Sequence, residues 1–120
     1  MRLIVLTAAM AGVFLCSAAS SDAKELRKQN QFLDAVAGKK LVSGDTWLVI
    51  SPDGKINGVG RNNAKLTGAW AWSKKFWCRN VVVGDKAFPE DCLKVSIDGN
   101  QVTFARNKGK GDAIVYTIAD

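Results

Sequence analysis

The sequence predicts a single small domain of the all-β class, built as an antiparallel meander with one short helix near its N-terminus. About seven segments rich in β-branched and aromatic residues follow one another at short spacing, separated by hairpin-type turn sequences. No helical pattern lies between these segments, which excludes a parallel α/β sheet because such a sheet needs helical crossovers. The pattern is typical of a small barrel or a two-layer sandwich and does not distinguish between them.

The first 23 residues are predicted to be a secretory signal peptide that precedes the domain. A positively charged N-terminus is followed by an apolar run over residues 3–16, which is shorter than the roughly 20 residues of a membrane-spanning helix. Small residues come next, and cleavage after Ala19 or after Ala23 fits them. Residues 24–120 then form the domain. We expect a periplasmic or secreted protein with no membrane span after cleavage; an uncleaved anchor and a lipid attached to Cys16 are the alternatives.

The cysteine count predicts one disulfide bond, Cys78–Cys92. The chain has three cysteines, and Cys16 lies in the predicted signal peptide, so two remain in the exported protein. An even count in a small exported chain is typical of a disulfide. A zinc site would lack ligands because the sequence has no histidine, so no metal is expected.

Residues 26–37 are predicted to form a short amphipathic helix. The segment has neither glycine nor proline, and its apolar residues Phe32, Leu33 and Val36 recur at helical spacing. Gly38 follows at the position where a helix commonly ends. We expect the apolar side of this helix to lie on the β structure or to plug it.

Two hairpin turns and one irregular loop separate the predicted strands. Proline and glycine in the turn 51–54, and Asp-Gly in the turn 98–100, favour tight hairpins. Residues 84–91 are predicted to be an irregular loop, closed at its base by the disulfide, with Phe88 and Pro89 at its tip. The strands are expected at residues 46–50, 55–59, 66–72, 76–83, 92–97, 101–106 and 113–118.

The charge balance indicates little about fold but restricts the partners. The formal net charge is +6, and the lysines are scattered among acidic residues, as on an ordinary solvated surface. A basic exported protein favours anionic partners, such as an acidic protein face or an anionic envelope component. Nucleic acid is not expected in that compartment, and the oligomeric state is left open.

The sequence predicts no enzyme and no cofactor. Without histidine, neither a Ser-His-Asp nor a Cys-His arrangement is possible. Oxidation of Cys78 and Cys92 removes a thiolate nucleophile. Glu90 and Asp91 are the only adjacent acidic pair after the signal peptide, and neighbours on an extended chain point to opposite faces.

Several aromatic, cysteine and glycine motifs resemble those of a family of small, largely uncharacterised exported proteins of alphaproteobacteria. The motifs are Gly68-x-Trp70-x-Trp72, Trp77-Cys78-Arg79, Asp91-Cys92, Val102-x-Phe104 and Gly109-x-Gly111. The resemblance extends from about Phe32 to the end of the chain and implies a fold rather than an activity. A weaker likeness is to the small β-barrel inhibitors of proteases and lysozyme in the bacterial periplasm, although none of their motifs is present.

Some members of that family carry the automatic name dihydrodipicolinate reductase, which this sequence does not support. That enzyme is roughly twice this size and binds a nicotinamide cofactor through a glycine fingerprint between a strand and a helix. The nearest match is Gly58-Val59-Gly60, but Asn63 replaces the third glycine and the segment lies in a hairpin region.

Six residues are the candidates for binding. Arg79, Lys86 and Phe88 lie in or beside the predicted 84–91 loop, and a rigid loop beside positive charge is typical of recognition. The first hypothesis is therefore an exported, non-enzymatic binding or inhibitory module. The second uses Trp70, Trp72 and Trp77, which either form the core or line a barrel that carries a small apolar ligand. A structural envelope or stress protein without a discrete site is the third.

Overall fold

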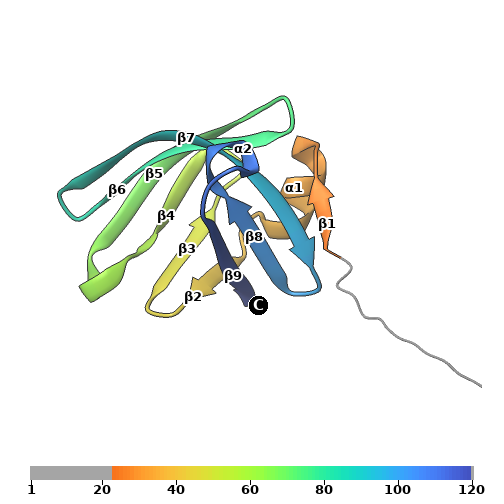
Figure 1. The fold of residues 1–120 in the computed structure, drawn as a ribbon. Helices are drawn as coiled ribbons and strands as arrows, with labels where there is room; N and C mark the ends of the chain where they lie inside the picture. The colour runs from red at the N-terminus through yellow and green to blue at the C-terminus, as the bar shows by residue number, and fades with distance from the viewer. Residues whose placement is uncertain (1–22, 120) are drawn as a thin grey trace, which may run out of the picture.

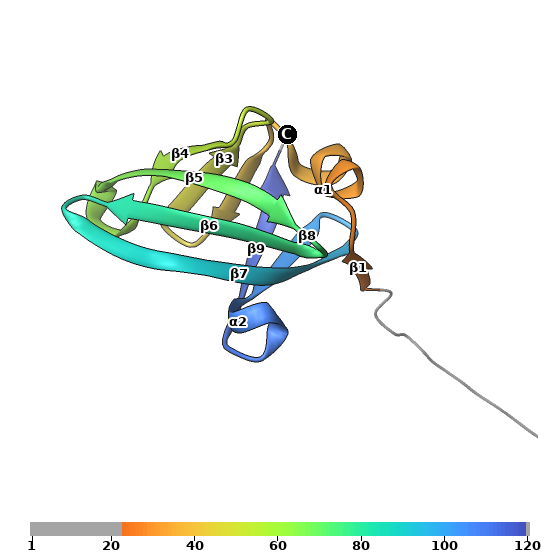
Figure 2. The ribbon, with the colours of Figure 1, turned by 90° about the horizontal axis from the view of Figure 1, so that it is seen from above.

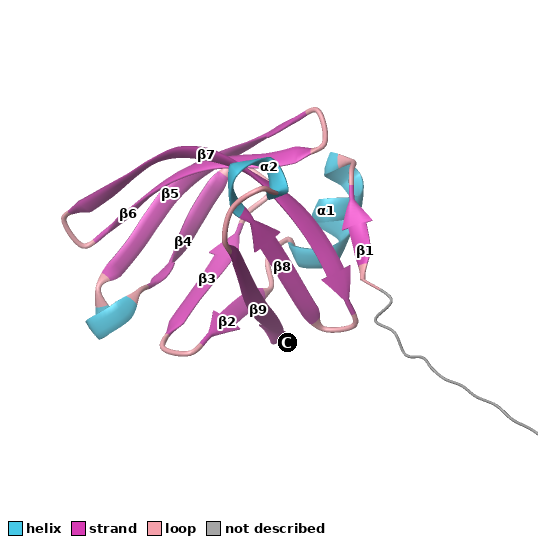
Figure 3. Ribbon diagram, viewed as in Figure 1, coloured by secondary structure: helices cyan, strands magenta, loops and turns pink. Residues whose placement is uncertain are grey.

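The computed structural model describes residues 23–119, so the predicted signal peptide and its cleavage sites lie almost wholly outside the described residues. Strands dominate this part of the chain (Figure 3). In chain order the elements are β1 (Lys24–Leu26), α1 (Gln29–Val36), β2 (Lys40–Ser43), β3 (Thr46–Ile50), β4 (Lys55–Val59), the 3-10 turn η2 (Arg61–Asn63), β5 (Lys65–Ser73), β6 (Phe76–Val83), β7 (Lys86–Asp98), β8 (Gln101–Ala105), the short turn α2 (Arg106–Gly109) and β9 (Ala113–Ala119).

Strands β2 to β9 close into an antiparallel barrel (Figure 1). The strand order is β1-β7-β6-β5-β4-β3-β2-β9-β8, and an additional pairing of β7 with β8 joins the two sides. The predicted all-β class is confirmed, and the closed ring of pairings settles the alternatives in favour of the barrel. Closure also leaves few free strand edges, which protects the sheet from pairing with other chains.

The long strand β7 closes the barrel because its two parts pair with two different strands. Its first part, Lys86–Leu93, pairs with β6, and its second part, Lys94–Asp98, pairs with β8. Strand β1 lies beside the second part, with Leu26 opposite Val95. Seen from above, β7 runs along the whole side of the molecule from β6 to β1 (Figure 2).

Helix α1 covers one end of the barrel, and the other end carries the turns β2–β3, β4–β5 and β6–β7. Figure 1 shows α1 on the opposite side of the barrel from η2 and the β6–β7 turn. Phe32 and Val36 of α1 have no exposed surface and point into the barrel core. The expected plug is therefore present, although the helix is shorter than the predicted 26–37: Leu26 belongs to β1, and the helix begins at Gln29.

Phe32 is the centre of the aromatic core at the plugged end. Its ring centroid lies 5.7 Å from Trp70, 5.2 Å from Trp72, 5.8 Å from Trp77 and 6.4 Å from Phe104. These separations are those of favourable edge-on and tilted aromatic pairs. One helical side chain thus joins α1 to strands β5, β6 and β8.

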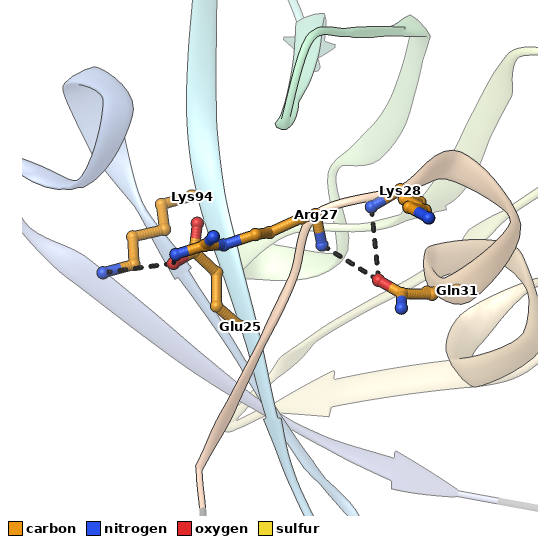
Figure 4. Close-up of polar contacts among 5 residues, drawn as sticks. All are labelled: Glu25, Arg27, Lys28, Gln31 and Lys94. Carbon is orange, nitrogen blue, oxygen red and sulfur yellow. Dashed lines mark hydrogen bonds and ion pairs between the residues drawn. The ribbon is translucent and has the colours of Figure 1, made fainter.

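Polar contacts fix the chain where β1 turns into α1 (Figure 4). The side-chain Oε1 of Gln31 accepts from the backbone N–H of Arg27 at 3.1 Å and of Lys28 at 3.3 Å. The Glu25 carboxylate lies 3.5 Å from the Arg27 guanidinium and 3.9 Å from the Lys94 ammonium on β7. The entry to the plug helix is therefore anchored to the barrel wall.

Two glycines permit the close strand packing of the barrel. A Cβ at Gly68 on β5 would collide with the carbonyl oxygen of Asn80 on β6. A Cβ at Gly58 on β4 would lie 2.6 Å from the Cα of Leu48 on β3. Glycine within a strand marks such close backbone approach, and it lets the sheet bend into a small ring.

The predicted loop at 84–91 is wrong. Only Gly84 and Asp85 form a turn, and β7 begins at Lys86. Pro89, which suggested a loop, lies instead where the register of β6 and β7 shifts: Arg79 is opposite Asp91 while Val81 is opposite Phe88. One extra residue on β7 forms a bulge there, and a bulge is a place where a strand tolerates proline. Strand β2 was also not predicted.

The predicted disulfide Cys78–Cys92 is confirmed, and its two residues lie directly opposite each other on β6 and β7. It therefore joins two paired strands beside the bulge. Across residues 23–119, no helix is long and apolar enough to cross a membrane.

Candidate functional site

The barrel encloses a cavity of about 790 Å³ at the end opposite α1. Its lining includes the β2–β3 turn, η2 and Lys86, so it opens where those turns meet. Small-molecule sites in proteins are typically cavities of about 300–1,000 Å³. The interior therefore has the size of a ligand site.

Strand β6 provides one wall of this cavity through alternation. Trp77, Arg79, Val81 and Val83 line it, because side chains two residues apart share one face of a strand. Val82 between them is 40% exposed. Consequently the strand presents an aromatic, a cationic and two aliphatic side chains to the interior.

The deep part of the cavity is apolar. Five buried side chains from β3, β4, β5, β7 and β8 join Trp77 in lining it: Leu48, Ile56, Leu66, Leu93 and Phe104. The Trp77 and Phe104 rings are 4.9 Å apart and separate the cavity from the plugged end, where Phe32 contacts both. Apolar lining of this kind favours an apolar ligand body by removing its surface from water.

Arg79 is the one buried charged residue of the described chain. It is 8% exposed, and its Nη1 donates a single hydrogen bond, 3.3 Å long, to the carbonyl oxygen of Pro89. Within residues 23–119, no carboxylate lies within 4.0 Å of its guanidinium. A guanidinium has five N–H donors, so most of those of Arg79 have no acceptor within this part of the chain. Burial lowers the pKa of Arg79 below its ordinary value, and the Asp91 charge partly offsets this.

The β7 bulge explains why the nearest carboxylate does not pair with Arg79. Asp91 lies opposite Arg79 in the register, but its carboxylate accepts from the backbone N–H of Asn107 at 3.2 and 3.3 Å. It thereby holds the α2 turn, where Asn107 and Lys108 adopt positive φ. The bulge instead turns the Pro89 carbonyl toward the guanidinium. Arg79 retains its charge, since arginine stays protonated in proteins.

The cavity lining also carries more positive than negative charge. Tyr116 lines the cavity, and burial raises the pKa of its phenol, so the hydroxyl is neutral at pH 7 and can donate a hydrogen bond. Arg79 and Arg106 lie near enough to lower the same pKa in part. The charged side chains of the lining are the cations Arg61, Arg79, Lys86 and Arg106 and the single carboxylate Asp45.

The three candidate tryptophans separate into two groups. The indole N–H of Trp70 donates to the Ser51 carbonyl at 2.9 Å, and that of Trp72 donates to the Lys74 carbonyl at 2.9 Å. Both rings pack on Phe32 and neither lines the cavity. Trp77 does line it, and its buried indole N–H has no acceptor among the described residues.

The other candidates gather in the same cavity rather than on a surface loop. Arg79, Lys86 and Phe88 all line it, and the Lys86 ammonium lies 5.0 Å from the centre of the Phe88 ring. Phe88 is half-buried and is not a loop tip. The structure thus brings Trp77, Arg79, Lys86 and Phe88 together, while Trp70 lies in the core and Trp72, partly buried, packs against it.

Sequence reasoning missed Arg61, Arg106 and Tyr116. A signal for the last two was present: Arg106 continues the inward alternation of Val102 and Phe104, and Tyr116 continues that of Ile114. Arg61 follows β4 within η2, and nothing in the local pattern indicates that the turn faces the mouth.

Replacing Arg79 by methionine is expected to stabilise the protein without ligand. Arg79 is a buried cation with one hydrogen bond, and an apolar side chain of similar length removes its desolvation penalty. We expect Arg79→Met to raise the free energy of unfolding by about 1–3 kcal/mol in urea titrations. The exposed Arg27→Met serves as the control and should change it by less than about 0.5 kcal/mol. A loss of stability in Arg79→Met would mean that Asp91 and Pro89 compensate the buried charge.

Comparisons with protein-family models, curated proteins and solved structures find no match for this chain. The resemblance to exported alphaproteobacterial proteins therefore stays a prediction, and any functional proposal rests on the geometry of the cavity. Between residues 23 and 119 there is no group of three or more histidine, cysteine, aspartate or glutamate side chains placed to hold a metal ion.

Proposed function

We propose that this protein is an exported, non-enzymatic carrier that holds a small, largely apolar ligand inside its barrel. The observation that supports it is the cavity of about 790 Å³, apolar in its depth and open at the end away from α1. The disulfide between β6 and β7 is in keeping with an oxidising compartment, either the periplasm or the medium.

The binding or inhibitory module has less support. That hypothesis depended on a rigid 84–91 loop that displays Phe88 and Pro89. Those residues belong to β7 instead, and Phe88 lines the cavity. A carrier uses Trp77, Arg79, Lys86 and Phe88 together, whereas a protein-binding loop would need them on an outer face.

The test is uptake of an apolar probe by a variant with a blocked mouth. Val83 lines the cavity near the mouth, and Val82 beside it faces outward. N-phenyl-1-naphthylamine, which is uncharged and fluoresces in apolar surroundings, is expected to bind wild type and Val82→Trp alike. Val83→Trp should weaken that binding at least tenfold, because the added indole occupies the ligand's path.

Native mass spectrometry of the protein taken from its own compartment provides a second measurement. One added mass of a few hundred daltons per chain, absent from Val83→Trp and present in Val82→Trp, would support the carrier. Equal probe binding by both tryptophan variants, or none by wild type, would overturn it.

A further inference from the structure

We propose that the ligand is an acidic amphiphile, whose anionic head group pairs with Arg79 inside the barrel while its apolar body lies against Trp77, Phe104 and Leu93. This inference rests on the carrier function and adds the chemical class of the ligand. It is carried by three features of the cavity wall: a buried guanidinium with no carboxylate within 4.0 Å among residues 23–119, an excess of positive charge, and a deep apolar surface.

The buried guanidinium of Arg79 is suited to an anionic acceptor. Arg79 is 8% exposed, lines the cavity, and makes one hydrogen bond of 3.3 Å to a neutral carbonyl. A buried charge is normally paired or hydrogen-bonded throughout, since an unpaired one is costly. A carboxylate accepts two parallel N–H bonds from a guanidinium, which matches the donors that Arg79 has free.

The groups around Arg79 indicate that the head group of the ligand is negatively charged. Arg106, the first residue of α2 directly after β8, and Tyr116, on β9, line the same cavity as Arg79. The Tyr116 hydroxyl is a neutral donor, and Asp45 at the mouth is the single carboxylate of the lining. A cationic head group would meet repulsion at this wall, and an uncharged ligand would leave the guanidinium without a partner.

The position of Arg79 along β6 determines how the ligand is oriented in the cavity. Trp77 lies two residues before it on β6 and Val83 four residues after it, toward the mouth. A strand rises about 3.3 Å per residue, so the guanidinium stands part of the way down the wall with apolar side chains on both sides. The indole N–H of Trp77, which has no acceptor among the described residues, places a further donor on the same strand.

The experiment compares two ligands that differ only in the head group. Decanoate and decan-1-ol share the apolar chain, and isothermal titration calorimetry is carried out on protein freed of bound lipid. We expect wild type to bind decanoate at least tenfold more tightly than decan-1-ol. Arg79→Met should lose this preference, because its affinity for decanoate falls at least tenfold relative to its affinity for decan-1-ol.

Controls separate this proposal from the carrier function. Arg27→Met removes an exposed cation near α1, outside the cavity, and should leave both affinities unchanged. Arg79→Lys keeps the charge and should retain part of the preference. If both ligands bind wild type equally and Arg79→Met changes nothing, the acidic head group is wrong and the carrier stands. If neither decanoate, decan-1-ol nor N-phenyl-1-naphthylamine binds, both proposals fail.

Discussion

Phe32→Ala is expected to lower the free energy of unfolding by about 3–5 kcal/mol, the usual effect of deleting a buried aromatic ring. Phe32 has no exposed surface and contacts rings from three strands, so no neighbour can move in to fill the space without disturbing several others. Urea unfolding followed by tryptophan fluorescence measures the effect, because Trp70, Trp72 and Trp77 surround the deleted ring.

The next residue provides the matched control. Leu33 lies on the same helix and is only half-buried, so Leu33→Ala should cost about 1 kcal/mol or less beyond any change in helix propensity. Equal losses in Phe32→Ala and Leu33→Ala would mean that α1 packs loosely and does not plug the barrel.

Removal of the disulfide is expected to lower the free energy of unfolding by roughly 3 kcal/mol. The bond joins residues with a sequence separation of 14, and the chain-entropy model assigns about that amount to a loop of this length. The comparison is between the oxidised wild type and the double variant Cys78→Ala/Cys92→Ala. Because Cys78 and Cys92 are already opposite each other on β6 and β7, the barrel should keep its fold and show the same far-UV circular dichroism.

Adding a reductant distinguishes the effect of losing the disulfide from the effect of replacing the two cysteine side chains. Dithiothreitol should destabilise the wild type to the level of the double variant and leave the double variant unchanged. An oxidised wild type with two free thiols would contradict the pairing, and a double variant as stable as wild type would show that the strand pairing alone fixes β6 on β7.

Local signals predicted strands β3 to β9 and the helix, although with other bounds for β7 and α1, whereas the contacts between distant residues could not be predicted. The turns 51–54 and 98–100 are specified by their own residues: Gly54 and Gly99 adopt positive φ, and both hairpins form as expected. Strand β2 has only four residues, and its identity depends on pairing with β3 and β9. The same holds for β1, which pairs with the far end of β7.

The candidate site was likewise predictable in its local pattern and not in its long-range contacts. Alternation along 76–83 places Trp77 and Arg79 on one face, but an arginine in a strand is usually solvated, so its burial cannot be inferred from the pattern. Pro89 favours a loop when taken by itself, and only the register of β6 against β7 converts it into a bulge within a strand. The convergence of Arg106 and Tyr116 on Arg79 requires the closed ring, which no local signal contains.

The pairing of β2 with β9 determines the order in which the molecule is completed. Lys40 lies opposite Ala119 and Val42 opposite Thr117, so the ring closes through residues from nearly opposite ends of the described chain. Contacts between residues so distant in sequence form late, because loop closure must come before them. Synthesis proceeds from the N-terminus, so the hairpin β3–β4 and both cysteines are available before β8 and β9 exist. The Cys78–Cys92 bond can therefore form without the closed ring, whereas the cavity is complete only after the last strand has been made.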